Sequence, residues 1–167
     1  MIGTPNRRGQ DMRTTRTVFL TVAVLVISAL SLCAADDSFM GSWKLNEAKS
    51  KIGAGAPKVT TVVYEAVGDQ LKVTAEGTLA DGSPLHDEWT GKLDGKDYPV
   101  NSGVAEDMRS YTRVNDRTLK FTNKKAGKVI TTGTVKLAAD GTSRTVTRTD
   151  TDANGKRVSS TQVYDKQ

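Results

Sequence analysis

The sequence predicts an all-β protein, an antiparallel up-and-down meander that closes into a barrel of about eight to ten strands. Turn dipeptides recur at short intervals, and the segments between them alternate apolar and polar residues with a period of two. No segment after Asp36 sustains helical periodicity beyond a short stretch. A meander either stays open or closes on itself, and closure removes the exposed strand edges. A twisted open sheet and a two-sheet sandwich are the alternatives to the barrel.

The turns that separate the predicted strands are rich in glycine, aspartate and asparagine. Asp-Gly and Asn-Gly pairs favour hairpins because both residues tolerate a positive φ. The turn signals stand at Gly68-Asp69, Asp81-Gly82, Asp94-Gly95, Asn115-Asp116, Ala126-Gly127, Asp140-Gly141 and Asn154-Gly155. They delimit predicted strands over residues 41–46, 58–67, 70–80, 84–93, 97–100, 107–114, 117–125, 128–139, 143–153 and 156–165. Asn46 is the predicted N-cap of one short helical turn.

The alternation also assigns side chains to faces. Leu71, Val73 and Ala75 are expected on one face of their strand. A second predicted face consists of Val129, Thr131, Gly133, Val135 and Leu137, although the apolar Ile130, of opposite parity, complicates this assignment. Trp43, in the opening strand, is expected to anchor the core and to plug one end of the barrel.

The first 35 residues have the composition of a secretory signal peptide. Basic residues precede an uncharged apolar segment, Val18–Leu32, and small residues follow it. A membrane-spanning helix needs about 20 apolar residues, and this segment is shorter. We therefore expect a signal helix within residues 1–35, cleavage after Ala35, and one domain over residues 36–167. The domain would be exported, to the periplasm or as a secreted protein.

Cys33 is the one cysteine of the chain, and it gives the same segment an alternative interpretation. Acylation of Cys33 would tether the domain to a membrane, but that processing prefers a small residue where this chain has Leu32. Cleavage after Ala35 instead leaves a mature chain without cysteine. Its stability would then come from burial and hydrogen bonds, without a disulfide. Met1 and Met12 are alternative starts of the leader.

The charge balance argues against a nucleic-acid partner. The formal net charge is +5, but four of the 24 basic residues and only one acid, Asp11, lie before Asp36, so the remainder carries +2. Proteins that bind nucleic acids cluster basic residues on one face. Here positive and negative charges alternate along the predicted strands.

His86 is the single histidine and the first candidate for catalysis or metal binding. On a strand its side chain shares a face with Glu88, whereas Asp87 points the opposite way. A zinc site needs three or four ligands, and a serine nucleophile needs an adjacent base; the sequence offers neither set. Most carboxylates stand in turns, such as Asp81, where turn chemistry explains them. We predict a solvated or structural His86, no catalytic residue, no metal and no cofactor.

The two ends of the predicted domain resemble one protein family. The segment Phe39-Met40-Gly41-Ser42-Trp43-Lys44-Leu45 looks like the opening strand of the calycin superfamily, the lipocalins and fatty-acid-binding proteins, which begins with Gly-x-Trp. The segment Ser160-Thr161-Gln162-Val163-Tyr164-Asp165 is similar to the last strand of the fatty-acid-binding branch. The resemblance implies a ligand-binding barrel, and exported bacterial lipocalin-like domains of unknown function are the nearer comparison.

Two departures from that family change what the resemblance implies. In the fatty-acid-binding branch a last-strand arginine and tyrosine hold a carboxylate inside the cavity. Tyr164 occupies the tyrosine position here, but Gln162 replaces the arginine. Losing the cation removes a charge-assisted bond, which favours a neutral ligand or none. The same branch inserts two lid helices after its first strand, and residues 46–58 are too short and too rich in glycine for such a pair.

These observations lead to two main functional hypotheses. The first is an exported, non-catalytic barrel that binds a small apolar or neutral lipophilic molecule, with Trp89, Tyr111, Gln162 and Tyr164 as candidate ligand-binding residues. The second is a structural or protein-interaction envelope module whose barrel is filled by its own side chains. A continuous interior cavity would distinguish the first from the second. A cluster of carboxylates, or His86, inside that cavity would favour an enzyme.

Overall fold

A computed structural model of the chain describes residues 38–102, 104–151 and 155–167. The predicted signal segment, residues 1–35 with Cys33, lies outside the described residues. The elements are β1 (Gly41–Leu45), η1 (Glu47–Lys49), β2 (Lys58–Val67), β3 (Gln70–Thr78), β4 (Pro84–Gly91), β5 (Tyr98–Pro99), β6 (Met108–Asn115), β7 (Thr118–Lys125), β8 (Lys128–Leu137), β9 (Ser143–Thr151) and β10 (Arg157–Lys166). Within this part of the chain, no helix has the length and apolar character to cross a membrane.

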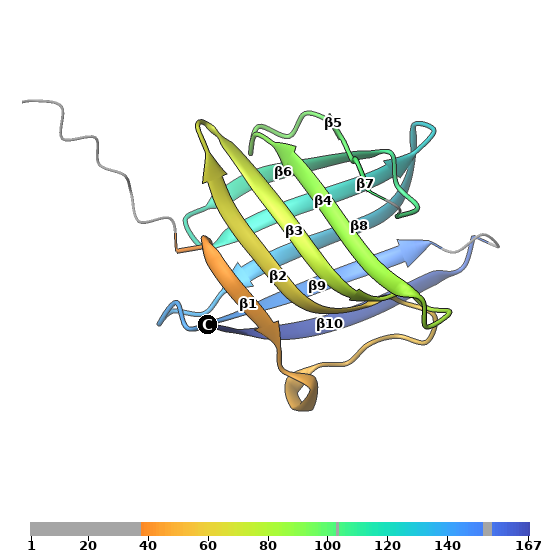
Figure 1. The fold of residues 1–167 in the computed structure, drawn as a ribbon, viewed down its shortest axis with the longest axis horizontal. Coiled ribbons are helices and arrows are strands. Elements are labelled where there is room, and N and C mark those ends of the chain that lie inside the picture. The colour runs from red at the N-terminus through yellow and green to blue at the C-terminus, as the bar shows by residue number, and fades with distance from the viewer. Residues whose placement is uncertain (1–37, 103, 152–154) are drawn as a thin grey trace, which may run out of the picture. The chain divides into compact units, whose positions relative to one another are not determined.

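The strands form a single antiparallel sheet of ten strands (Figure 1). Its order is β4-β3-β2-β1-β10-β9-β8-β7-β6-β5, so each pair of neighbouring strands is consecutive in the chain except β1 with β10. The sheet wraps round until β4 comes to lie beside β5 and β6, which makes a nearly closed barrel. The predicted fold class is confirmed, and the predicted strand bounds differ from the observed ones by at most two residues.

The predicted helical turn is a short 3₁₀ helix, η1. The side chain of Asn46 accepts a hydrogen bond from the backbone N–H of Lys49 at 3.2 Å, so Asn46 is the N-cap as expected. The following Gly-rich segment is packed against β10. The N–H of Gly53 donates to Ser160 Oγ at 3.0 Å, and a Cβ atom at Gly53 would lie 2.6 Å from the carbonyl oxygen of Ser159. Glycine is needed here because the two backbones approach so closely.

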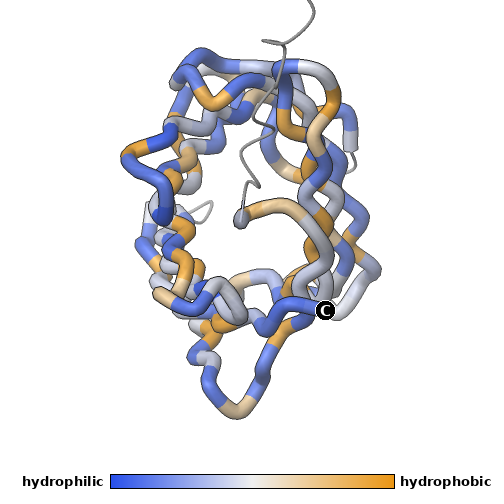
Figure 2. The backbone as a smooth tube through the Cα atoms, turned by 90° about the vertical axis from the view of Figure 1, so that its left-hand side faces the viewer, coloured by the Kyte–Doolittle hydropathy of each residue, from blue (hydrophilic) through white to orange (hydrophobic). Residues whose placement is uncertain are grey.

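Trp43 is an anchor of the core, as predicted. Its side chain is fully buried, and its indole Nε1 donates to the carbonyl of Phe39 at 2.9 Å. The ammonium of Lys166 lies 5.3 Å from the indole centroid, within the range of a cation–π contact. We call this region the closed end. Hydrophobic and hydrophilic residues alternate along the strands of the barrel wall (Figure 2).

Most of the predicted faces are confirmed. Leu71, Val73 and Ala75 are all buried in the core. On β8, Thr131, Val135 and Leu137 are buried as expected. Gly133 lies directly opposite Phe121, and a Cβ atom there would be 2.3 Å from its ring, which places Gly133 on the inward face.

The prediction for Val129 is wrong. Val129 is 50% exposed, whereas its neighbour Ile130 lines the barrel interior. The pairing of β7 with β8 shifts register between Asn123 and Lys124. A bulge of this kind adds a residue to one strand, so the residues beyond it exchange faces.

The barrel wall has one junction without a continuous ladder, where β4 meets β5 and β6. Two isolated bridges join it, Trp89 with Val100 and Asp94 with Thr112. Every other pair of neighbouring strands among the described residues is joined by a ladder, the shortest being that of β5 with β6. We call this junction the seam.

Candidate functional site

The barrel contains a cavity of about 430 Å³. Exposed residues in or beside the turns at one end, Ala80, Asp81 and Thr151, line it, so the cavity opens to solvent there. We call this opening the mouth; it lies at the opposite end of β9 from Arg144. Most of the wall is apolar, with the inward side chains Val59, Val62, Val73, Ala75, Leu85, Phe121, Val135 and Val146. Apolar walls with a few placed polar groups are typical of small-molecule sites.

Three of the four predicted ligand-binding residues line this cavity: Tyr111, Gln162 and Tyr164. Trp89 does not line it. The indole of Trp89 is 2% exposed, packs 4.9 Å from the ring of Tyr111 between centroids, and donates from Nε1 to the carbonyl of Arg109 at 3.2 Å. Trp89 therefore packs within the wall at the seam and is bonded across it.

Gln162 and Tyr164 form a hydrogen-bonded pair on β10. The hydroxyl of Tyr164 lies 2.6 Å from Gln162 Oε1 and 3.0 Å from the carbonyl of Val59, and it donates its one proton to these acceptors. Gln162 Nε2 donates to the carbonyl of Pro57 at 3.2 Å. Burial raises the pKa of the Tyr164 phenol and outweighs the opposing effect of Arg144, so the phenol stays protonated at neutral pH.

Arg144, on β9, supplies a cation beside Tyr164 that sequence reasoning missed. The two residues are direct cross-strand partners, and Arg144 is 1% exposed. Its guanidinium carbon lies 4.4 Å from the ring centroid of Tyr64, 4.7 Å from that of Trp43 and 5.3 Å from that of Tyr164. No described carboxylate pairs with it, and its Nε and Nη1 have no hydrogen-bond partner among the described residues. Arg144 therefore has two buried donor nitrogens, Nε and Nη1, that the surrounding protein does not use.

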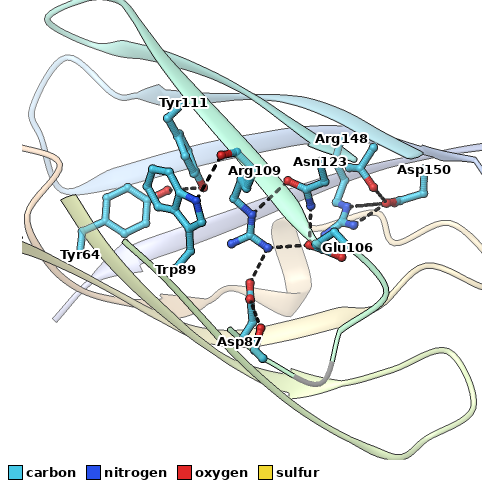
Figure 3. Close-up of polar contacts among 11 residues, drawn as sticks. Tyr64, Asp87, Trp89, Glu106, Arg109, Tyr111, Asn123, Arg148 and Asp150 are labelled. Atoms are coloured by element: carbon cyan, nitrogen blue, oxygen red, sulfur yellow. Dashed lines mark hydrogen bonds and ion pairs between the residues drawn. The ribbon is translucent and has the colours of Figure 1, made fainter. Parts of the chain in front are cut away.

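A pair of phenols lies near this cation. The hydroxyls of Tyr64 and Tyr111 are 3.3 Å apart, and both residues line the cavity (Figure 3). Two hydroxyls share one hydrogen bond, so the phenol that accepts still has its own proton to donate. Burial, followed by the neighbouring Tyr64, raises the pKa of Tyr111 well above its ordinary value. The inner part of the cavity is therefore rich in hydrogen-bond donors.

A polar belt crosses the barrel nearer the mouth. Its first four members are in direct cross-strand register on β6, β7, β8 and β9: Arg109, Asn123, Thr131 and Asp150. Asp87, Glu106 and Arg148 complete the belt, which Figure 3 shows in close-up. All seven residues line the cavity.

Arg109 is the centre of the belt. Its Nη2 donates to Asp87 at 2.7 Å and to Glu106 at 2.5 Å, and its Nε donates to Asn123 Oδ1 at 3.0 Å. Asp87 also accepts from Ser102 Oγ at 2.8 Å. Burial opposes the charge of Arg109, but the carboxylates of Asp87 and Glu106 outweigh it and hold its pKa above the ordinary value. Arg109 is therefore a charged cross-link between Asp87, Glu106 and Asn123.

Arg148 and Asp150 form the second ion pair of the belt. Arg148 Nε donates to Asp150 Oδ2 at 2.9 Å, and a second nitrogen, Nη2, contacts Oδ1. Thr131 Oγ1 donates to the same carboxylate at 2.7 Å. Unlike Arg144, both arginines of the belt have carboxylate partners.

His86 lies outside the cavity, on the solvent face of β4. It is 58% exposed, and its Nδ1 is 2.6 Å from Glu76 Oε1. Asp87 points inward, as the strand periodicity predicted for the opposite face. No group of three or more His, Cys, Asp or Glu side chains in the described part of the chain is placed to hold a metal ion.

The His86–Glu76 contact gives a testable pH dependence. The hydrogen bond to Glu76, and then its negative charge, raises the pKa of His86 above its ordinary value of 6.5. The pair therefore contributes stability below pH 6.5 that is lost as the pH rises through the folded-state pKa. The effect on stability is small because both side chains are exposed. We expect an NMR titration of this one histidine to give a raised pKa that Glu76→Gln returns towards 6.5; an unchanged pKa in that variant would exclude Glu76 as the cause.

Comparison with known proteins gives structural neighbours only. Neither a family model nor a curated protein matches the sequence. The fatty acid binding protein of Schistosoma mansoni, in complex with arachidonic acid, superposes with a TM-score of 0.55 at 17% identity over 78% of this chain and 96% of that one. A redesigned β barrel, mFAP1, bound to DFHBI, gives 0.41 at 18% identity over 77% and 95%. Apocrustacyanin C1 gives 0.37 at 12% identity over 78% and 62%.

The ten-strand meander, the Trp43 core anchor and the open-ended interior cavity agree with the architecture that the two ends of the sequence implied. The superposition on a fatty acid binding protein covers nearly all of that protein. The chain therefore has the same barrel fold as this fatty acid binding protein.

Proposed function

We propose that the barrel binds a small lipophilic molecule whose polar group is a hydrogen-bond acceptor, anionic in its preferred form, and that Arg144 holds this group. The observation that carries the proposal is a buried guanidinium, with two unused donor nitrogens, in the wall of an apolar cavity. The Schistosoma mansoni protein with the same fold is described in complex with arachidonic acid, a lipid of this class.

The cavity supports a ligand over a filled barrel. Its volume of about 430 Å³ falls in the range of small-molecule sites, about 300–1,000 Å³. An envelope module with a filled interior would have no continuous cavity. Apolar residues from β2, β3, β4, β7, β8 and β9 line the space, which suits an alkyl or ring system.

Arg144 determines the chemistry of the polar group. A buried cation without a counter-ion is costly, and the faces of three aromatic rings offset only part of that cost. The neighbouring phenols of Tyr64 and Tyr111 have a proton to donate, so the inner cavity presents donors to a ligand. An acceptor group, above all a carboxylate, satisfies both kinds of donor with charge-assisted bonds.

This proposal revises the ligand charge expected from the sequence. The expectation of a neutral ligand rested on Gln162 at the last-strand position where the fatty-acid-binding branch has arginine. Gln162 is inside the cavity wall, hydrogen-bonded to Tyr164 and Pro57. Arg144 reaches the same region from β9, the neighbouring strand, and restores a cation.

The proposal remains non-catalytic, although carboxylates do line the cavity. Asp87, Glu106 and Asp150 are the carboxylates of the polar belt, and each accepts hydrogen bonds from an arginine. General acid catalysis needs a carboxyl group that holds and delivers a proton. His86, the one imidazole, is on the outer surface.

We also propose that the domain acts outside the cytoplasm, because residues 1–35 have the composition of a signal peptide. Native mass spectrometry of the protein recovered from the exporting cell checks export and cargo together. We expect a chain that begins at Asp36, with a lipophilic acid released on denaturation. An intact leader would contradict export. A protein recovered without any bound molecule would count against a carrier function.

Binding of matched probes to the purified domain tests the role of Arg144. We expect laurate to displace Nile red more effectively than dodecanol, which has the same chain length without the charge. Arg144→Met should reduce the preference for laurate by about 10- to 100-fold, the value of a lost hydrogen bond to a charged group. Arg144→Lys, which keeps the charge but not the planar fork, should retain part of the preference.

The same variants separate a binding role from a structural one. Methionine in place of an unpaired buried cation is expected to leave the melting temperature unchanged or to raise it. An equal affinity for laurate and dodecanol in the unmodified protein would exclude Arg144 as the anchor. If Nile red itself fails to bind, the cavity is not a lipophilic site and a structural or protein-interaction module becomes the better account.

A further inference from the structure

The seam is held differently at its two ends. Towards the closed end, backbone groups bond across it: the N–H of Gly95 donates to the carbonyl of Tyr111 at 2.8 Å, and that of Arg113 to the carbonyl of Leu93 at 3.3 Å. Towards the mouth, the first residues of β4 have no backbone ladder with β6 among the described residues. Apart from the isolated bridge of Trp89 with Val100, the hydrogen bonds and ion pairs across this half of the wall, in the described part of the chain, involve side chains.

Two of these contacts meet at Arg109 on β6. The carboxylate of Asp87, from β4, accepts from its guanidinium at 2.7 Å, and the indole of Trp89, also from β4, donates to its carbonyl at 3.2 Å. Both contacts cross the seam, as Figure 3 shows. Asp87 and Arg109 also line the cavity, so the seam is a boundary between the cavity and the outside.

We propose that the barrel wall opens at the mouth half of the seam, where β4 separates from β6. The Asp87–Arg109 ion pair is the latch that sets how often this opening occurs. Parting of the seam widens the mouth and admits or releases the cavity's occupant. The passage of a ligand through the opened seam rests on the proposed function, whereas the opening itself does not.

The reason is the cost of local opening. Elsewhere, separating two strands breaks a ladder of backbone hydrogen bonds. Here it breaks one ion pair, the Ser102–Asp87 hydrogen bond, one indole bond and the short bridge at Val100. Local openings occur preferentially where backbone bonding is sparse. An ion pair is also easier to separate at a mouth than in a sealed core, because water reaches both charges as they part.

Glu106 provides a matched control. It contacts the same nitrogen of Arg109 as Asp87 does, at 2.5 Å, and it contacts Asn123 on β7. Neither partner of Glu106 is on β4. Asp87→Asn and Glu106→Gln therefore remove the same charge from the same arginine, but only the first breaks a contact across the seam.

The two tryptophans of the chain report on the motion without any ligand. The indole N–H of Trp89 is bonded across the seam, and that of Trp43 is bonded within the closed end. We expect Asp87→Asn to accelerate hydrogen exchange at the Trp89 indole, followed by NMR, by about tenfold, the factor for one charge-assisted bond. Trp43 should be unaffected, and Glu106→Gln should leave both indoles close to the unmodified protein.

Stopped-flow binding of Nile red tests the consequence for the cavity. Association and dissociation rates should both rise in Asp87→Asn by a similar factor, with the dissociation constant almost unchanged, because a latch affects passage and not the bound state. Ser102→Ala removes the other bond to Asp87 and is the milder variant should Asp87→Asn fail to fold. Ser102→Ala should also raise the two Nile red rates and the exchange rate at the Trp89 indole, by about threefold.

Each outcome bears on a different part of the inference. Unchanged exchange at Trp89 in both seam variants would overturn it, whatever the ligand does. Faster exchange at Trp89 with unchanged Nile red rates would leave a motion that is not the route of entry, which overturns the latch. Faster exchange in a protein that does not bind Nile red at all would support the motion and contradict the proposed function.

Discussion

Replacing Arg109 by methionine lowers the free energy of unfolding by about 3–5 kcal/mol, the usual cost of removing one partner from a buried ion pair. The cost arises because Asp87 and Glu106, both inside the barrel, lose the guanidinium that balances their charges. Asn123 also loses the donor to its side-chain oxygen. Urea denaturation followed by tryptophan fluorescence measures the difference.

A compensated variant distinguishes charge from packing. Arg109→Met combined with Asp87→Leu and Glu106→Gln leaves no unpaired charge in this part of the belt, and it should recover most of the lost stability. If the single variant loses less than about 1 kcal/mol, water reaches the cluster and the belt is not a buried network. If the triple variant remains as unstable as the single one, packing of the arginine stem is the larger contribution.

Replacing Trp43 by alanine lowers the free energy of unfolding by about 3–5 kcal/mol, as expected for a large side chain removed from a core. Trp43 is fully buried and is contacted by Arg144 and Lys166 on its faces. The substitution also opens the closed end, where the indole is bonded to Phe39. Trp89 remains as the fluorescent reporter of the denaturation curve.

Trp43→Phe is the control for this second prediction. It keeps an aromatic ring but removes the indole hydrogen bond, and we expect it to cost about 1–2 kcal/mol. Equal losses for the alanine and phenylalanine variants would mean that the hydrogen bond, and not the buried area, accounts for the stability. A loss below about 1 kcal/mol for alanine would contradict the assignment of Trp43 as a core residue.

The strands were predictable because their signals are local. Asp-Gly and Asn-Gly turns limit each strand from both sides, and alternation identifies faces where one side is apolar, as at Leu71, Val73 and Ala75. Val129 was misassigned because a bulge is a property of the pairing between strands. The extra residue, Ile130, is on β8, where two residues of β8 are passed for one of β7; an apolar residue out of alternation is the one local sign of it.

The polar interior was not predictable in the same way. On β9 one face carries Thr145, Thr147 and Thr149, and the other carries Arg144, Val146, Arg148 and Asp150. Neither face is clearly apolar, so periodicity cannot say which is inside. The inward direction is settled by closure of the barrel, which sets Arg144 opposite Tyr164. The family resemblance could identify Tyr164 and Gln162 from their place in the last strand. It could not identify Arg144, because that residue comes from the neighbouring strand.

Asp87 is the one belt residue that the sequence could have indicated. Leu85 and Trp89 share its parity, and both are apolar and buried. A single carboxylate between two buried residues on a strand predicts an inward polar group with a partner. Trp89 shares this inward parity but contacts Tyr98, Tyr111 and Arg109 at the seam, so its parity did not by itself predict a place in the cavity lining.

The unpaired state of Arg144 has a consequence for the lifetime of the protein. Any molecule that neutralises this charge binds the folded chain and not the unfolded one, so occupancy shifts the folding equilibrium by mass action, by about 2.7 kcal/mol at a free concentration 100 times the dissociation constant. Proteases act on the unfolded fraction. A loaded chain would thus outlast an empty one, and abundance of the protein would follow the supply of its cargo.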